Sequence, residues 1–136
     1  TIQRIKQKEV MRPMEPLAVV ENYLEAFRRR DFEAARACLA DRGFEYISPI
    51  ASFDDADVFI SGMDGVGAIL HRLETRLRFV EGNDVCHVLD ITVSMDGYQT
   101  SRLVQLARVK GDRIVRLEAI FDASDFHRMI GDPSLG

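Results

Sequence analysis

The chain has 136 residues, of which 46% are hydrophobic and 29% charged, with a formal net charge of -4. This size is sufficient for one domain with a buried hydrophobic core. The acidic balance argues against a nucleic-acid partner, because surfaces that bind phosphates concentrate Lys and Arg. The apolar runs are far shorter than the ~20 residues that span a bilayer, so no membrane partner is expected.

Two further features indicate the compartment. The first residues, TIQRIKQKE, lack the apolar stretch of a signal peptide. Cys38 and Cys86 are not arranged in a metal-binding or redox spacing. We therefore expect a cytoplasmic protein with two reduced, mostly buried thiols.

The N-terminal third predicts an arm followed by two helices. Residues 1–15 are polar, contain Pro13 and show no sustained period, so the domain is expected to cover 16–136. Apolar residues at helical spacing predict a first helix that starts at Pro16; these are Leu17, Val20, Leu24 and Phe27. Asp31 is a suitable N-cap for a short second helix that ends near 41–43.

The middle of the chain predicts a strand, a loop and a third helix. The segment FEYIS (44–48) is rich in strand-forming residues and ends at Pro49. An acidic loop, 54–57, follows, and 58–60 reads as a brief strand. Apolar residues at three- and four-residue steps predict a helix from about Asp64 to 82–83; these are Val66, Ile69, Leu70, Leu73 and Leu77.

The last third has the alternating period of strands. Three strands are predicted over 84–94, 98–109 and 113–121, joined by the turns MDG and KGD. A last amphipathic segment, 124–130, predicts a short C-terminal helix. Helices followed by an antiparallel meander indicate an α+β fold with the helices on one sheet face. A curved sheet of this kind leaves a cavity where the helices do not reach, and such a cavity is the default ligand site.

Four segments make the chain resemble the NTF2-like superfamily, and within it the SnoaL-like and ketosteroid isomerase-like proteins. They are VVENYLEAFRRRDFEAA, ISPI, ISGMDGVGAIL and IVRLEAIFD. The resemblance covers about 16–127 and implies a cone-shaped domain in which the curved sheet wraps around about three helices. It also implies a cavity used for isomerisation, cyclisation, dehydration, epoxide hydrolysis or simple binding.

The resemblance implies roles for individual residues. Tyr23 matches the helix-one tyrosine that donates a hydrogen bond to a substrate oxyanion in ketosteroid isomerases. Ser48 stands where those enzymes have the aspartate base, and a serine hydroxyl does not hold a proton taken from carbon near neutral pH. The second oxyanion donor aligns with Gln105 or with Leu106. Gln105 is preferred because Arg102 and Arg108 then lie on the outward face of the strand.

Strand alternation supplies the cavity wall. His87, Leu89 and Ile91 share one face of the first meander strand, so His87 is expected to point inward. Leu117, Ala119 and Phe121 share a face of the last strand and are expected to line the cavity. Imidazole suits proton transfer near neutral pH, which makes His87 the candidate base.

Two functions remain open at this point. The first is a SnoaL-like protein that binds a small, largely apolar molecule in the cavity. The alternative is a cofactor-free isomerase, cyclase or dehydratase that acts on a small carbonyl compound, with Tyr23 as donor and His87 as base. His71 and His127 are expected to face solvent, and no spacing indicates a metal site or a cofactor.

A homodimer is expected in either case. The outer sheet face carries Val88, Val104 and Leu106 among charged residues, which is too apolar in part to be left exposed to water. Sheet-to-sheet dimerisation would cover this face, as the resemblance also implies.

Overall fold

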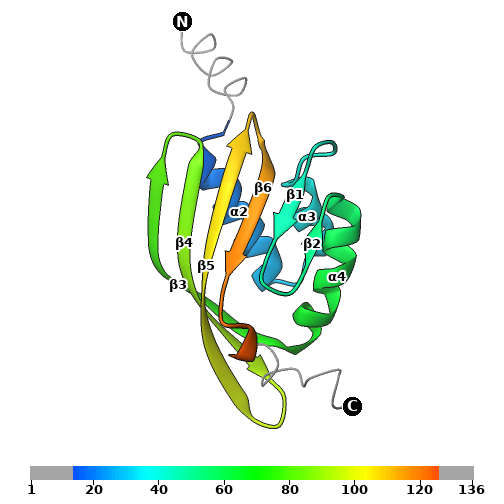
Figure 1. Ribbon diagram of the computed structural model, residues 1–136, viewed down its shortest axis with the longest axis vertical. Helices are drawn as coiled ribbons and strands as arrows, with labels where there is room; N and C mark the ends of the chain where they lie inside the picture. Colours follow the sequence, from blue (N-terminus) through cyan, green and yellow to red (C-terminus); the bar gives the residue numbers. More distant parts are fainter. Residues whose placement is uncertain (1–13, 126–136) are drawn as a thin grey trace, which may run out of the picture.

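The computed structural model of the protein describes residues 14–125. Figure 1 shows a long curved sheet with helix α2 lying behind it and helix α4 beside the shorter strands. The sheet order is β2-β1-β6-β5-β4-β3, and every neighbouring pair is antiparallel except β1 with β6. The elements are α2 (Pro16–Arg28), α3 (Phe32–Ala37), β1 (Glu45–Ile47), β2 (Ser52–Phe53), α4 (Ala56–Ile69), β3 (Leu70–Glu81), β4 (Asp84–Ser94), β5 (Tyr98–Lys110) and β6 (Arg113–Ile120).

The predicted α+β architecture is confirmed, and so are its first two helices. Helix α2 starts at Pro16 and buries one face against the sheet. The buried residues of α2 are Val19, Val20, Tyr23, Leu24, Ala26 and Phe27. Asp31 caps α3, because its carboxylate accepts a hydrogen bond from the backbone N–H of Ala34 at 3.0 Å. The short α3 ends earlier than predicted, with Cys38 as its C-cap.

The prediction of a third helix from about Asp64 to 82–83 is correct only as far as Ile69, and the predicted strand at 58–60 is wrong. The helix α4 begins at Ala56, because the Asp55 carboxylate accepts hydrogen bonds from the backbone N–H groups of Asp57 and Val58 at 2.8 and 3.1 Å. Residues 58–60 therefore lie within α4. From Leu70 the chain runs as strand β3, antiparallel to β4.

The three-stranded meander is confirmed within one residue at each strand end. Strands β4 and β5 bury alternate residues, whereas β6 buries Ile114 and then Leu117 and Ala119, because its pairing with β5 shifts register at Arg108/Val109. The turns between strands contain glycines with positive φ. The predicted C-terminal helix over 124–130 falls mainly on residues outside the described part. None of the helices within residues 14–125 is long and apolar enough to cross a membrane.

Two glycines of α4 allow a direct test of its packing. A Cβ at Gly67 would lie 2.2 Å from Cζ of Phe32, whereas a Cβ at Gly65 would meet no atom within 4 Å. We expect Gly67→Ala to lower the free energy of unfolding by roughly 1–3 kcal/mol through overpacking. We expect the matched control Gly65→Ala to raise it by about 0.5–1 kcal/mol through helix propensity. Urea denaturation measures both, and equal stability of the two variants would contradict the packing.

Candidate functional site

A cavity of about 160 Å³ lies on the concave side of the sheet, between α2 and α4. It is closed on one side by the aromatic rings of Tyr46 and Phe59, which stack with their centroids 4.4 Å apart. The lining is predominantly aliphatic and aromatic. The lining residues are Tyr23, Leu24, Phe27, Tyr46, Ile50, Phe59, Met63, Val66, Ile69, Leu73, Leu89, Ile91, Val93, Ser101, Leu103, Gln105, Ala119 and Phe121.

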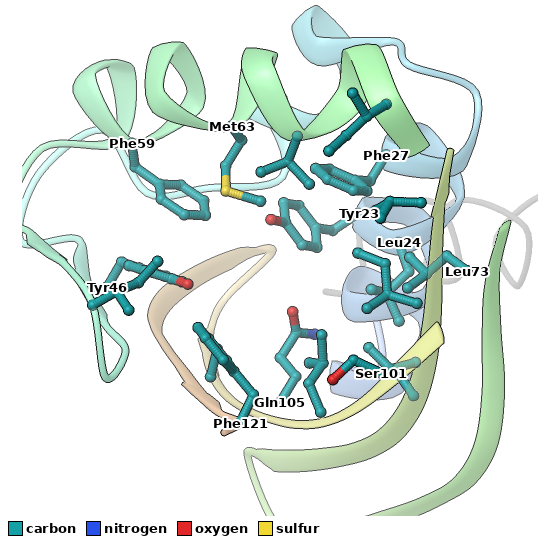
Figure 2. A pocket seen from close by; sticks show the side chains of 18 residues that line it. Tyr23, Leu24, Phe27, Tyr46, Phe59, Met63, Leu73, Ser101, Gln105 and Phe121 are labelled. Atoms are coloured by element: carbon teal, nitrogen blue, oxygen red, sulfur yellow. The ribbon is translucent and has the colours of Figure 1, made fainter. Parts of the chain in front are cut away.

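Four lining residues carry polar side-chain atoms, and none of the four is charged at neutral pH. Figure 2 shows the hydroxyl of Tyr23 reaching the middle of the cavity from α2, with Tyr46 on the facing side. Burial, reinforced by the nearby Tyr46, raises the pKa of the Tyr23 hydroxyl far above its ordinary value. Burial also raises the pKa of Tyr46, against the opposing effect of a hydrogen bond with Ser48. Both phenols are therefore protonated donors at neutral pH.

Gln105 and Ser101 supply the other polar groups, from β5. Gln105 is 8% exposed, and its Nε2 has no hydrogen-bond partner among the described residues. Its carbonyl oxygen points into the cavity in Figure 2. The hydroxyl of Ser101 donates to Oδ2 of Asp125 at 3.0 Å. The neighbouring Leu106 is 39% exposed on the other face of the sheet, so the structure places Gln105 rather than Leu106 in the cavity.

The structure brings most of the remaining sequence-derived site residues together. Leu89, Ile91, Ala119 and Phe121 line the cavity beside Tyr23 and Gln105. Leu117 lies instead in the hydrophobic core and is outside the lining.

Ser48 is also outside the lining, because it builds a tight turn after β1. Its Oγ accepts hydrogen bonds from the backbone N–H groups of Ile50 and Ala51 at 3.3 and 3.2 Å. Its own backbone N–H donates to the carbonyl oxygen of Ala51 at 2.9 Å. The hydroxyl is thus used in local structure.

His87 points inward but lies apart from the cavity lining. It is fully buried, and its Nε2 lies 3.1 Å from Oε1 of Glu21 on α2. Nη1 of Arg78 donates to the same carboxylate oxygen at 2.6 Å. Burial acts to raise the pKa of Glu21, but hydrogen bonds from Arg78 and His87 outweigh it and lower the pKa overall. At neutral pH the Glu21 carboxylate is therefore ionised.

Sequence reasoning missed the lining residues contributed by β1 and α4. Tyr46 was treated only as part of a strand, and Phe59 and Met63 fell outside the predicted third helix. A usable signal was present in the acidic segment 54–57, since Asp55 followed by an acidic first turn is a helix start. Starting the helix there would have placed Phe59, Met63 and Val66 on one face.

The cavity chemistry is therefore that of neutral hydrogen bonding in an apolar space. No Asp, Glu, His, Lys, Arg or Cys side chain is among the described lining residues. Within residues 14–125, no three such metal-ligating side chains come together in a way that could hold a metal ion. His71, predicted on a helix and facing solvent, lies exposed on β3 and stacks on Tyr98 with ring centroids 4.3 Å apart.

Solved structures share this arrangement of sheet and helices. An NTF2-like protein of unknown function from Burkholderia pseudomallei superposes with a TM-score of 0.76 at 21% identity, covering 88% of this chain and 100% of its own. The chain has the NTF2-like fold. An LEH-like epoxide hydrolase from M. tuberculosis shares the fold with a TM-score of 0.73 at 16% identity, covering 87% of this chain and 90% of its own.

A third NTF2-like neighbour, TerC, was co-crystallised with polyporic acid. It has a TM-score of 0.75 at 20% identity and covers 86% of this chain and 98% of its own. No protein-family model and no curated protein sequence matches the chain. The structures with this fold thus include an epoxide hydrolase and a protein of unknown function, and the likeness defines the fold alone.

The partly buried contact of Glu21 on α2 with His87 and Arg78 of the sheet predicts a pH dependence of stability. Glu21→Gln should lower the free energy of unfolding by roughly 1–2 kcal/mol at pH 7, because charge-assisted hydrogen bonds are lost. The pKa of Glu21 is below its ordinary value of 4.5, so its contribution is present above about pH 4.5 and is lost as the pH falls through the folded pKa. The difference between wild type and variant should therefore shrink on acidification.

The matched control is Glu25→Gln on the same helix. Glu25 forms an exposed ion pair with Arg28 at 3.5 Å, and such surface pairs contribute little. Denaturant titrations from pH 3 to 7 give the comparison. A Glu21→Gln difference that stays constant across this range would contradict the ionised buried contact.

Proposed function

We propose that the protein binds a small, largely apolar molecule that bears one oxygen function, in the cavity between α2, α4 and the sheet. The observation that carries this is an apolar cavity of about 160 Å³ with uncharged polar groups at its centre. An apolar cavity of about 150 Å³ is large enough to bind benzene. A single substituted ring is therefore a ligand of suitable size.

The polar groups fix the orientation of such a ligand. Nε2 of Gln105 is buried and has no hydrogen-bond partner among the described residues. The Tyr23 hydroxyl points into the cavity, where a ligand oxygen can accept a hydrogen bond from it. A hydrogen bond of this kind contributes about 0.5–1.5 kcal/mol, and this favours an oxygen-bearing ring over a hydrocarbon.

The proteins of similar fold support the binding of a small molecule, but they do not specify which molecule this chain binds. TerC, which shares the NTF2-like fold, was solved with polyporic acid, so this architecture accommodates a small organic molecule in at least one neighbour. The epoxide hydrolase shows that the same fold also serves catalysis. Function within a shared fold depends on the site residues, and here those residues are neutral.

The alternative is a cofactor-free isomerase, cyclase or dehydratase with Tyr23 as donor and His87 as base. It requires a group that takes up a proton within reach of the ligand. The Nε2 of His87 is engaged with Glu21, and His87 is outside the lining. This geometry favours binding. Turnover of a small carbonyl compound that is lost in His87→Leu would favour the enzyme instead.

The binding proposal predicts the effect of removing one hydroxyl. Phenol, anisole, acetophenone and toluene are titrated into the full chain and followed by ¹H–¹⁵N NMR. Tyr23→Phe should weaken the three oxygen-bearing ligands roughly three- to tenfold, because one hydrogen bond is lost. Toluene, which has no oxygen, should be unaffected or bind more tightly.

The matched control is Tyr98→Phe, since Tyr98 is 68% exposed and lies outside the lining. Its hydroxyl is remote from the ligand, so all four affinities should match wild type. Absence of saturable binding by any of the four compounds at millimolar concentration would rule out the proposed ligand size and polarity.

We also propose that the protein forms a homodimer through the outer face of its sheet. Leu77, Val88, Val104 and Ile120 are successive cross-strand partners on β3, β4, β5 and β6, and they form an apolar row across this face. The leucine and the isoleucine are 56% and 48% exposed. A continuous apolar row of this kind is typical of a surface that is covered by another protein.

Ion pairs on both sides of the apolar row favour a second copy as the partner. Arg102 pairs with Asp90 at 2.9 Å, and Arg108 pairs with Asp84 at 2.9 Å. Because each charge is already neutralised within its own chain, two copies can approach without net repulsion across the row. An isologous two-fold interface then places the same row on itself.

The dimer predicts a change in sedimentation when the row is interrupted. The wild-type chain should sediment as a dimer at micromolar concentration, and Leu77→Asp should weaken association by tenfold or more, roughly the effect of losing one apolar contact of the row and placing a charge there. Val58→Asp is the control, since Val58 is 54% exposed on α4, away from the row. A wild-type monomer at this concentration would overturn the proposal.

A further inference from the structure

Two buried nitrogen atoms beside the cavity lack hydrogen-bond partners among the described residues. They are Nδ1 of His87 and Nε2 of Gln105. The two residues are directly opposite each other in the register of β4 and β5, and both are buried on the inner face. Such partners have Cβ atoms about 4.5–5.5 Å apart, so their side chains are within reach of one another. The two unpartnered atoms are therefore neighbours in the fold.

Glu21 determines which nitrogen of His87 carries the proton. The Glu21 carboxylate is ionised at neutral pH and only accepts hydrogen bonds, so Nε2 of His87 is the donor across the 3.1 Å contact. Arg78 donates to the same carboxylate and supplies its counter-charge. Because Arg78 already balances the carboxylate, a second positive charge on the buried ring would be uncompensated, which favours Nδ1 as an acceptor.

We propose that His87 is a positioning residue that fixes the orientation of the Gln105 amide. The two atoms are not hydrogen-bonded to each other in the structure. An adjustment of the two side chains would let Nε2–H of Gln105 donate to Nδ1 of His87, and the amide carbonyl oxygen would then be the group presented to the cavity. The inference is carried by the complementarity of two buried, unpartnered atoms on directly opposed residues, since one donor and one acceptor can satisfy each other. Figure 2 shows the carbonyl oxygen of Gln105 facing the cavity, as this hydrogen bond requires.

The fixed amide identifies the class of ligand, and in this respect the inference rests on the proposed binding function. The cavity offers a donor, the Tyr23 hydroxyl, and an acceptor, the carbonyl oxygen of Gln105. A hydroxyl group accepts from the first and donates to the second, whereas an ether or ketone oxygen only accepts. The ligand class is therefore a small ring compound with a free hydroxyl group, such as a phenol.

The proposed series of hydrogen bonds runs from the surface to the cavity. Arg78 is exposed on β3, Glu21 lies at the edge of α2, His87 is fully buried on β4, and Gln105 lines the cavity. Without the His87 acceptor, the Gln105 amide could rotate and present either its oxygen or its nitrogen to a ligand. His87 thus sets ligand selectivity through Gln105, without contacting the ligand.

The test compares phenol with anisole, in which a methyl group replaces the hydroxyl hydrogen. Both oxygens accept from Tyr23, and only phenol donates to Gln105. The quantity measured is the ratio of the two dissociation constants for the full chain. Wild type should favour phenol, and His87→Leu and Gln105→Leu should each reduce that preference roughly three- to tenfold, the effect of one hydrogen bond.

His71→Leu is the matched control, since it removes an exposed histidine of the neighbouring strand and should leave the ratio unchanged. His87→Leu retains the ion pair between Glu21 and Arg78, which favours a folded variant. If it nevertheless fails to fold, Gln105→Leu still measures the preference. A wild-type ratio that His87→Leu leaves intact would overturn the positioning role.

An NMR measurement tests the hydrogen bond without any ligand. Long-range ¹H–¹⁵N spectra of the imidazoles should show His87 protonated at Nε2 and unprotonated at Nδ1, with the Nδ1 shift altered in Gln105→Leu. Protonation at Nδ1, or no change in that variant, would overturn the inference. If none of the ring compounds binds, the proposed function fails, and the imidazole spectra still decide whether His87 holds the Gln105 amide.

Discussion

The difference in length between helix α2 and the strands it covers determines most of this structure. The helix has 13 residues, or about 20 Å at 1.5 Å per residue. Strand β5 also has 13 residues, or about 43 Å at ~3.3 Å per residue. One helix therefore cannot cover the concave face of the sheet. Helix α4 and the aromatic residues of β1 and β2 cover the rest of the concave face. The space between α2 and this second group of elements is the cavity.

Because α2 is shorter than the strands, inward-facing residues of one strand lie in two different environments. His87 and Leu89 are two positions apart on β4 and both point inward, yet only Leu89 lines the cavity. His87 lies under α2, where Glu21 is available to satisfy its Nε2. Gln105, directly opposite His87, lines the cavity. The boundary between covered core and cavity thus falls at His87 and Gln105, the one buried polar cross-strand pair among the described residues.

Sequence patterns predicted those parts of the fold in which one local period dominates. The strands β4 and β5 alternate along their length, and glycine turns bound the meander, so the strand limits were predicted within one residue. Strand β3 was misread as a helix because its pairing with β4 contains two register shifts. Such irregularities interrupt the two-residue alternation. As a result, Leu70, Leu73 and Leu77 recur at the three- and four-residue steps of a helix.

The sequence predicted which face of its strand each site residue lies on. It did not predict how far along the strand the cavity extends. Alternation placed Gln105 inward and Leu106 outward, because the arginines at 102 and 108 belong on the exposed face. Alternation also placed His87 inward. It contains no information on where along the strand the helix cover ends, since that depends on the tertiary position of α2. Sequence therefore indicated which residues face the concave side and left open which of them reach the cavity.

The alternation of the strands also explains how one sheet can serve two surfaces. Odd-numbered residues of β5 such as Gln105 face the cavity, while even-numbered residues such as Val104 face outward in the apolar row. A change on one face leaves the chemistry of the other face in place. Cavity selectivity and association between copies are therefore separable properties of the same sheet, and a variant with altered ligand preference is not expected to lose the outer surface.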